Sequence, residues 1–415
     1  MKVKDLLKKW NNSSLIIRIV IGLVGGTVLA LLAPQATGIS ILGEIFVGAL
    51  KAIAPVLVFV LVMSSLAQAN EGIGRQFRTV IALYMLSTFL AAVVAVIASF
   101  AFPVKLTLTA AISETAPGGI GEVLSKLLTN IVVNPVTSLM NANYIGILAW
   151  AVIFGLALKK CASTHTKEML SDISNAVSRT VKWIINCAPF GIMGLVFTSV
   201  STNGLGIFSD YGTLLLILIG CMLAVALIVD PLIAFITLRR NPYPLVFRCL
   251  KESGITAFFT RSSAANIPIN MQLCERLGLD KDVYSVSIPL GATINMDGAA
   301  ITITVMTLAA AHTMQMAVDI PAAIILSVLA AVAACGASGV AGGSLLLIPM
   351  ACSLFGISND VAMQVVGVGF IIGVVQDSFE TAINSAGDAM FAATAEYREW
   401  IREGRDFKVG EEINK

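Results

Sequence analysis

Acidic and amide side chains gather in an apolar stretch near the end of the chain. Four polar residues recur there at spacings of four, three and four residues, which places them on one face of a helix. They are Asp377, Thr381, Asn384 and Asp388, and Glu380 lies one turn from two of them. An acid inside a membrane span costs about 2.5–3.5 kcal/mol, so three of them would not face lipid. We expect this face to line a cavity, a cation site or a ligand site, with a polar helix–helix contact as the alternative.

A second polar segment, at 291–298, reads Gly-Ala-Thr-Ile-Asn-Met-Asp-Gly inside another apolar run. Its two glycines free backbone carbonyls from regular helix geometry, and Asp297 supplies a negative charge. Several oxygens at close range suit a hard cation such as Na⁺. The segment therefore predicts a cation site around Asn295 and Asp297, and a helix kink that binds no ion is the alternative.

Two weaker signals lie in other apolar runs. Tyr84, Ser87 and Thr88 share a helix face, but serine and threonine in membrane helices often only bond back to carbonyls of their own helix. Asp230 precedes a proline near the end of its run, and we interpret this pair as a local structural feature. Neither signal predicts a site by itself.

The composition indicates what kind of protein must position these residues. Of 415 residues, 57% are hydrophobic and 13% are charged, against about 25% charged in soluble domains. Such a chain cannot cover a water-facing surface, which excludes a soluble enzyme, a disordered chain and a nucleic-acid-binding protein. The net charge of +2 attracts no polyanion, and the seven cysteines and two histidines have no metal-ligand spacing.

Eight apolar runs are long enough to cross a bilayer, which takes about 20 helical residues. They lie near 15–33, 42–68, 79–103, 131–158, 180–200, 211–238, 282–312 and 359–395. Lysine and arginine are concentrated in the N-terminal segment, in alternate loops and in the C-terminal tail, and such residues favour the cytoplasm. We therefore expect both termini to be cytoplasmic.

Two further apolar segments, at 247–277 and 321–356, are interrupted. The second would be ~54 Å long as one helix, and a glycine-rich stretch at 336–344 divides it into arms too short to cross. Irregular backbone at membrane depth is tolerated where protein or a cavity covers it. We predict two re-entrant helical hairpins that enter from opposite sides and form an inverted repeat, which is typical of secondary transporters. Two short surface helices are the alternative.

Four motifs together resemble one family of membrane proteins. They are Thr260-Arg-Ser-Ser, the segment 291–298, the glycine-rich stretch 336–344 and the spaced residues Asp377, Thr381, Asn384 and Asp388. This set is similar to that of the dicarboxylate/amino acid:cation symporters, the glutamate-transporter homologues, over essentially the whole chain. Glu380 and the run Arg-Ser-Ser-Ala-Ala-Asn at 261–266 look most like the bacterial sodium/serine-threonine branch.

The resemblance implies an all-α polytopic fold with eight transmembrane helices, two opposed re-entrant hairpins and inverted repeats. It also implies a homotrimer in the bacterial inner membrane. Scaffold segments would lie at 1–78 and 131–210, transport-domain segments at 79–130 and 211–396, and a cytoplasmic tail at 397–415. The transport domain would move against the scaffold in the manner of an elevator.

The resemblance further implies three sets of sodium ligands. The first set is Gly291, Asn295, Asn384 and Asp388. The second set is Thr293, Ala334, Cys335 and Ala337. The third set is Tyr84, Ser87, Thr88, Asn295 and Asp297. The third set thus gives a role to Tyr84, Ser87 and Thr88, whose spacing alone predicts no site.

Substrate would lie between the hairpin tips. The implied substrate residues are Arg261, Ser262, Ser263, Val340, Gly342, Asp377, Glu380, Thr381 and Asn384. The chemistry agrees, because the ammonium group of a zwitterionic amino acid needs a carboxylate such as that of Asp377. The substrate's own carboxylate suits N–H groups at a hairpin tip, such as those of Ser262 and Ser263, together with the Asn384 amide. Arg261 is expected to pair with either Asp377 or Glu380, and the sequence leaves this open.

Glu380 separates this chain from relatives that carry acidic amino acids, because they have arginine at that position. A glutamate would repel an acidic side chain and accept a hydrogen bond from a serine or threonine hydroxyl. We therefore predict sodium-coupled import of small neutral amino acids, serine and threonine above all. The alternatives are a sodium- or proton-coupled symporter of another substrate (a dicarboxylate, or an acidic or other neutral amino acid), an ion channel and, least favoured, an intramembrane enzyme, since Ser262 and Ser263 lack a suitably placed histidine.

Overall fold

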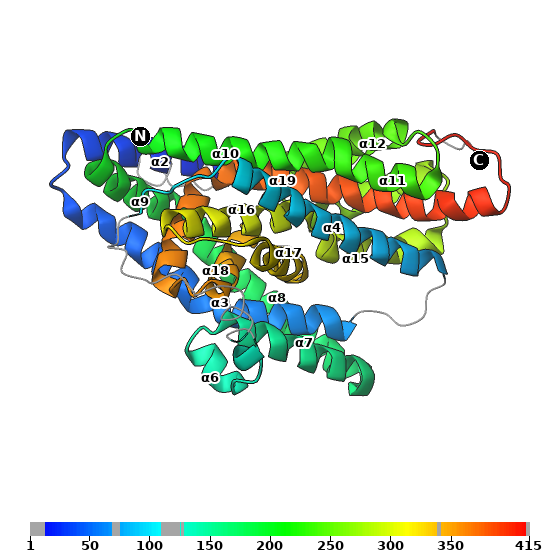
Figure 1. Cartoon of the computed structure of the whole chain (residues 1–415), viewed down its shortest axis with the longest axis horizontal. Helices are drawn as coiled ribbons and strands as arrows, with labels where there is room; N and C mark the ends of the chain where they lie inside the picture. The colour runs from blue at the N-terminus through cyan, green and yellow to red at the C-terminus, as the bar shows by residue number, and fades with distance from the viewer. Residues whose placement is uncertain (1–12, 69–74, 109–124, 126–127, 338–341, 412–415) are drawn as a thin grey trace.

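The described part of the chain is helical. The computed structural model describes residues 13–68, 75–108, 125, 128–337 and 342–411, and every regular element in these ranges is a helix. Most of the helices lie along the long axis of the molecule, and the C-terminus lies at one end of it (Figure 1).

The helices follow one another along the chain in three stretches. The N-terminal group is α2 (Leu15–Leu32), η1 (Thr37–Ile39), α3 (Ser40–Gln68), α4 (Arg75–Ala101), α6 (Pro135–Met140), α7 (Tyr144–Cys161), α8 (Thr164–Asn186) and α9 (Ala188–Asn203). The next helices are α10 (Ile207–Ala224), η2 (Val225–Val229), α11 (Asp230–Leu238), α12 (Tyr243–Cys249), η3 (Leu250–Gly254), α13 (Ile255–Thr260) and α14 (Ser263–Arg276). The last are α15 (Lys281–Ile294), α16 (Asp297–Thr313), α17 (Ile320–Ala334), η4 (Ser344–Leu347), α18 (Ile348–Leu354) and α19 (Asn359–Arg402).

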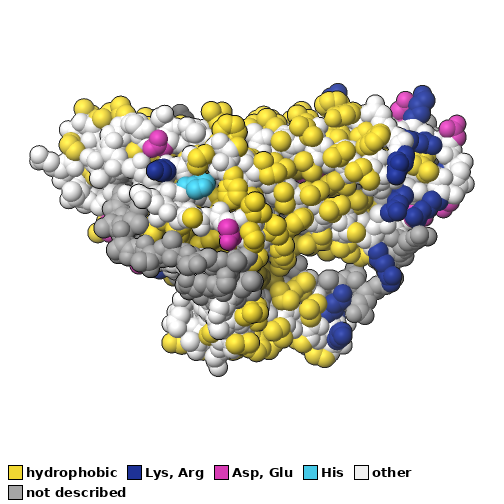
Figure 2. All heavy atoms as spheres, in the orientation of Figure 1, with side chains coloured by type: hydrophobic (Ala, Val, Ile, Leu, Met, Phe, Trp, Pro, Cys, Tyr) yellow, Lys and Arg dark blue, Asp and Glu magenta, His cyan; other side chains and the backbone are white. Residues whose placement is uncertain are grey.

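The helices agree with a polytopic membrane protein. Within the described residues, seven helices are long and apolar enough to cross a membrane, or eight if the bent pair α8 and α9 counts as one span. The pair is bent by 52°, where Pro189 follows the end of α8 and cannot continue the hydrogen-bond pattern. Hydrophobic side chains cover the middle of the molecule in Figure 2, which suits contact with lipid tails.

One predicted span begins later than expected. The run 131–158 was expected to be a single helix, but α7 begins only at Tyr144 and the short α6 precedes it. Asn134 and Asn143 each accept N–H groups at a helix start, and Ala142 between them has φ +50°. Two caps and a left-handed residue divide the run, because capping asparagines begin new helices.

The packing separates two sets of helices. On one side α2 packs against α9, and α3 packs against α7, α8 and α9. On the other side α16 packs against α4, α17, α18 and α19. The apolar stretch of α15 and α16 is 94% buried inside the protein, whereas that of α2 is 22% buried. The second set therefore encloses the polar residues that the sequence singles out.

Three helical stretches that pack against α19 are interrupted. Between α15 and α16, Asn295 and Met296 leave helical geometry, with ψ of 84° and 51°. Between α13 and α14, Arg261 has φ +52° and Ser262 is extended. The span from α10 to α11 is widened by the π-helix η2, just before Pro231. Such breaks free backbone groups from helical pairing.

The segment after α19 folds back onto the base of α12. The Arg240 and Arg248 guanidinium groups donate to the carbonyls of Phe407 and Gly410, at 2.9 and 3.0 Å. Gly410 has φ +77°, and a Cβ there would lie 2.6 Å from the Leu245 nitrogen. Glycine is needed for this close approach, so the segment after α19 packs in a defined position against α12.

Candidate substrate and cation site

Helix α19 places its predicted polar face inward. Five of its residues are buried among the neighbouring helices: Asp377, Glu380, Thr381, Asn384 and Asp388. Helices α4, α13, α14, α15 and α16 all pack against α19. The helical spacing read from the sequence therefore corresponds to one buried polar face.

Asp377 joins the two interrupted apolar segments, 247–277 and 321–356. The Arg261 Nε atom, at the break between α13 and α14, donates to Asp377 Oδ2 at 2.6 Å. The Gly342 N–H, from the glycine-rich stretch after α17, donates to Asp377 Oδ1 at 3.3 Å. This settles the open question of the Arg261 partner in this structure: the guanidinium pairs with Asp377. The Thr381 hydroxyl donates to the Asp377 carbonyl at 2.7 Å and continues the same face.

Glu380 lies in a cage of neutral donors. Its Oε2 atom accepts hydrogen bonds from the Thr302 and Ser344 hydroxyls, both at 2.8 Å, and from the Gln376 amide. All four side chains are buried. Because these donors hold one oxygen, the carboxylate has a fixed orientation and keeps Oε1 for a further partner.

The tip between α13 and α14 carries the predicted serines. Ser262 accepts the Ala265 N–H with its hydroxyl oxygen at 3.2 Å, which caps α14. Ser263 is the first residue of α14 and is buried. N–H groups at such a helix start attract anions. Val340, the other predicted tip residue, lies outside the described residues.

Asn295, Asn384 and Asp388 form the second polar cluster. The Asn295 amide donates to the Asn384 carbonyl at 3.1 Å and to Asp388 Oδ1 at 3.2 Å. The Gly298 N–H donates to Asn384 Oδ1 at 2.8 Å. Asp388 Oδ2 and Asn295 Oδ1 are buried and have no hydrogen-bond partner within the described part of the chain. Buried oxygens of this kind fit a cation, because leaving them bare is costly.

Glycines allow this close approach. A Cβ on Gly291 would lie 2.7 Å from Asp388 Oδ1 and 2.8 Å from the Tyr84 hydroxyl. A Cβ on Gly387 would lie 2.6 Å from Asn295 Nδ2. Any side chain at either position would push the polar groups apart.

Helix α4 contributes the third cluster, around Asp297. The Thr88 hydroxyl lies 2.9 Å from Asp297 Oδ1, and the Ser87 hydroxyl lies 2.9 Å from Asp297 Oδ2. The Met296 N–H donates to Thr88 at 3.2 Å. The Tyr84 hydroxyl instead lies 2.9 Å from the Asp388 carbonyl. The structure thus places Tyr84, Ser87 and Thr88 beside the break between α15 and α16.

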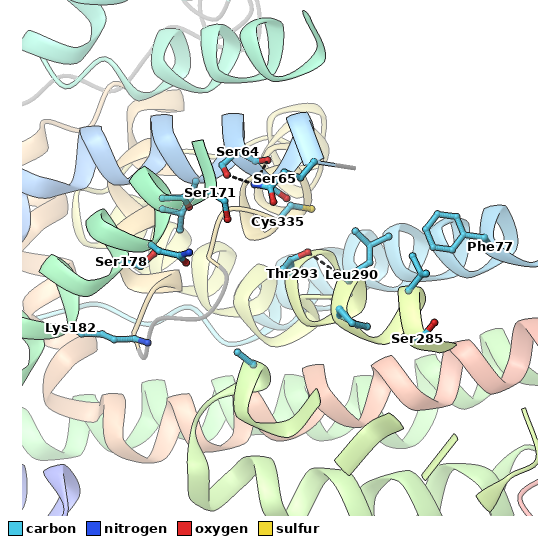
Figure 3. A pocket seen from close by; sticks show the side chains of 17 residues that line it. Ser64, Ser65, Phe77, Ser171, Ser178, Lys182, Ser285, Leu290, Thr293 and Cys335 are labelled. Carbon is cyan, nitrogen blue, oxygen red and sulfur yellow. Dashed lines mark hydrogen bonds between the residues drawn. The ribbon is translucent and has the colours of Figure 1, made fainter. Parts of the chain in front are cut away.

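Thr293 and Cys335 lie on the wall of a cavity of about 560 Å³. Ser64 and Ser65 of α3 and Ser171, Ser178 and Lys182 of α8 line one side of it in Figure 3, opposite Leu290 and Thr293 of α15. Cys335 follows α17, and its sulfur lies 3.8 Å from the Ile294 carbonyl. Ala334 and Ala337 flank it, and the Ala337 N–H donates to the Ala334 carbonyl at 2.9 Å. Two members of the second predicted sodium set, Thr293 and Cys335, therefore lie at this cavity.

Sequence reasoning did not select four polar residues that touch these clusters. Thr302, Ser344 and Gln376 surround Glu380, and the only available signal was their polarity within apolar runs. Asp230 was interpreted as a local structural feature, yet the Ser87 hydroxyl lies 2.6 Å from its Oδ1 atom. The rule that an acid inside a span marks function would have selected it.

Comparison with known proteins gives a consistent picture. Residues 15–397 match the profile described as the sodium:dicarboxylate symporter family. The chain is 63% identical over 404 residues to a serine/threonine transporter SstT of Bifidobacterium adolescentis, covering 97% of this chain and 94% of that protein. Proteins of the same name from Streptococcus agalactiae and Streptococcus thermophilus are 61% and 58% identical, over 95% and 96% of this chain and 98% and 99% of their own lengths.

Proposed function

The chain belongs to the sodium:dicarboxylate symporter family, and from this premise we propose that it imports serine and threonine together with sodium. The relatives named above are called serine/threonine transporters. The observation that carries the proposal is the Asp377 carboxylate, which contacts a side chain or N–H group from each of the two interrupted regions. A site assembled from two such breaks can bind a small zwitterion and respond to its presence.

We propose that both interrupted regions are re-entrant hairpins of opposite entry, and that they belong to inverted repeats. The arms α17 (Ile320–Ala334) and α18 (Ile348–Leu354) are too short to cross a bilayer. The division into a scaffold (1–78 and 131–210) and a transport domain (79–130 and 211–396) has support in the two sets of packed helices. A homotrimer remains the expectation from the family resemblance.

The end of the molecule that carries the C-terminus is the proposed cytoplasmic side. Lysine and arginine side chains gather there in Figure 2, at the end where the C-terminus lies in Figure 1. Such a concentration marks the cytoplasmic face of bacterial membrane proteins. The cavity of about 560 Å³ is lined in part by Gln68 and Phe77. These residues lie at the connection between the second and third predicted spans, which is one of the basic loops expected in the cytoplasm. We take the structure to represent an inward-facing state.

The substrate would replace contacts that the protein now makes with itself. The ammonium group would take the place of the Arg261 guanidinium on Asp377, since both are cations that bind a carboxylate. The substrate carboxylate would accept N–H groups at the Ser262–Ser263 tip and from the Asn384 amide. A serine or threonine hydroxyl would donate to the free oxygen of Glu380, whose other oxygen is held by three donors.

Sodium would occupy the oxygen clusters beside this site. Asp388 Oδ2 and Asn295 Oδ1 are buried acceptors without partners among the described residues, and hard cations bind such oxygens. One sodium ion moving down ~100 mV and a tenfold gradient releases about 3.7 kcal/mol. That free energy supports roughly a 500-fold accumulation of a neutral substrate.

Uptake into proteoliposomes tests the proposal. Labelled serine should accumulate when sodium is high outside and should not accumulate when choline replaces sodium. Unlabelled threonine should compete, and aspartate should not. Equal uptake with and without the sodium gradient would exclude sodium coupling. Sodium currents that do not depend on serine would instead favour a channel.

A further inference from the structure

Asp230 is a buried acid that the three implied sodium sets do not include. Its side chain is 3% exposed, and it begins α11 directly after the π-helix η2. Pro231 has no N–H to bond to the Leu227 carbonyl four residues back, and that carbonyl accepts the Tyr243 hydroxyl at 3.1 Å. Such π-bulges are frequent at functional sites. The irregular turn therefore has a physical cause, and it presents Asp230 to α4.

The Ser87 hydroxyl lies between two carboxylates. Its Oγ atom is 2.6 Å from Asp230 Oδ1 and 2.9 Å from Asp297 Oδ2. A hydroxyl carries one hydrogen and two lone pairs, so it can donate to only one of these oxygens. With both acids ionised, the shorter contact favours donation to Asp230. The lone pairs of Ser87 Oγ and Asp297 Oδ2 then face each other with no hydrogen between them.

Two carboxylates at this place lack a counter-charge. The ion pairs among the described residues include neither Asp230 nor Asp297, and Asp297 is fully buried. An ionised carboxylate buried without a positive partner is strongly destabilising. In the same helix break, Asn295 Oδ1 is buried and has no partner among the described residues. A bound cation would compensate these oxygens.

We propose that Asp230 is a positioning residue for the sodium ion held at Asp297. By accepting the Ser87 hydrogen, it turns the Ser87 lone pairs toward the ion, and its charge adds to that of Asp297. Carboxylates that orient a metal ligand in this way raise metal affinity by about 10–100-fold. The inference rests on the proposed function, because it takes the ion to be sodium.

Asp230→Asn tests this role, since asparagine keeps the size and an acceptor oxygen but removes the charge. The sodium concentration that gives half of the full thermal stabilisation of the purified protein should rise at least about tenfold. The sodium concentration for half-maximal serine uptake should rise in parallel. Choline chloride keeps the ionic strength constant. Asp210→Asn is the matched control, because Asp210 Oδ2 also accepts a hydroxyl, that of Thr107 at 3.1 Å, and lies outside the site.

The outcomes separate the two proposals. A wild-type protein that sodium does not stabilise contradicts sodium binding itself. A wild-type protein that responds to sodium, with an Asp230→Asn variant whose melting temperature without sodium falls while its sodium midpoint is unchanged, overturns the role of Asp230 alone. If Asp230→Asn does not fold, Asp230→Glu takes its place. It shifts the carboxylate by one methylene and should change the midpoint at least about threefold, and an unchanged midpoint overturns the proposal.

Discussion

Glu380 and Asp388 are both buried acids on α19, yet their surroundings differ. Glu380 Oε2 accepts three side-chain hydrogen bonds, from Thr302, Ser344 and Gln376. Asp388 Oδ1 accepts one, from Asn295, and Asp388 Oδ2 accepts none from the described residues. The same helix therefore offers one carboxylate that three donors hold through a single oxygen and one that has a single donor.

The difference indicates two kinds of partner. Neutral donors fix the position of Glu380 without cancelling its charge, which suits selection of a substrate by a hydrogen bond and by repulsion. A buried carboxylate with so few donors is stabilised by a positive charge beside it, which suits an ion. We infer that selectivity lies at the Glu380 end of this face and ion coupling at the Asp388 end.

The largest expected effect comes from inverting the charge at Glu380. Glu380→Arg should lower serine uptake at least about 100-fold, because a larger buried cation replaces the carboxylate that is proposed to accept the substrate hydroxyl. Unlabelled aspartate should begin to compete for uptake, since arginine can pair with an acidic side chain.

Glu380→Gln provides the comparison for this variant. It removes the charge and keeps the size, so it should lower serine uptake less and gain no aspartate binding. Aspartate competition that is unchanged in Glu380→Arg would contradict the selectivity role.

The next largest effect is expected at Asp388, at the other end of the polar face of α19. Asp388→Asn should raise the sodium concentration for half-maximal serine uptake by about 10–100-fold, because it removes a ligand charge. The affinity for serine at saturating sodium should change little. Asp360→Asn is the control, because Asp360 lies on the same helix but pairs with Lys51 near the surface. An unaltered sodium dependence in Asp388→Asn would remove it from the ion site.

The smallest effect should come from loosening the donor cage. Gln376→Leu removes one of three donors to Glu380, and we expect the serine concentration for half-maximal uptake to rise about three- to tenfold. The sodium midpoint should stay the same. Ser378→Ala, whose hydroxyl bonds to the Val374 carbonyl of its own helix, should leave both values unchanged. A shift of the sodium midpoint in Gln376→Leu would show that the two ends are not separate.

Much of this arrangement could be predicted from residue spacing. The recurrence of Asp377, Thr381, Asn384 and Asp388 identified one face of a helix, and the helix is continuous through it. The glycines around Asn295 and Asp297 predicted a break, which occurs at Asn295 and Met296. Both features depend on residues that are close together in the sequence, so the sequence alone predicts them.

Contacts between distant segments could not be predicted in the same way. The pairing of Arg261 with Asp377 depends on how two helix breaks meet, and sequence chemistry allowed Glu380 equally. Thr302 and Ser344 resemble the many hydroxyl residues of apolar helices that bond only to their own backbone. Asp230 gained meaning only when packing placed it beside Ser87.

The fitted C-terminal segment has a practical consequence. Since Phe407 and Gly410 are bonded to Arg240 and Arg248, the described segment that follows α19 must move together with α12. A fluorophore coupled at Glu411 and a second one on α7 should therefore change their energy transfer if the transport domain moves against the scaffold as proposed.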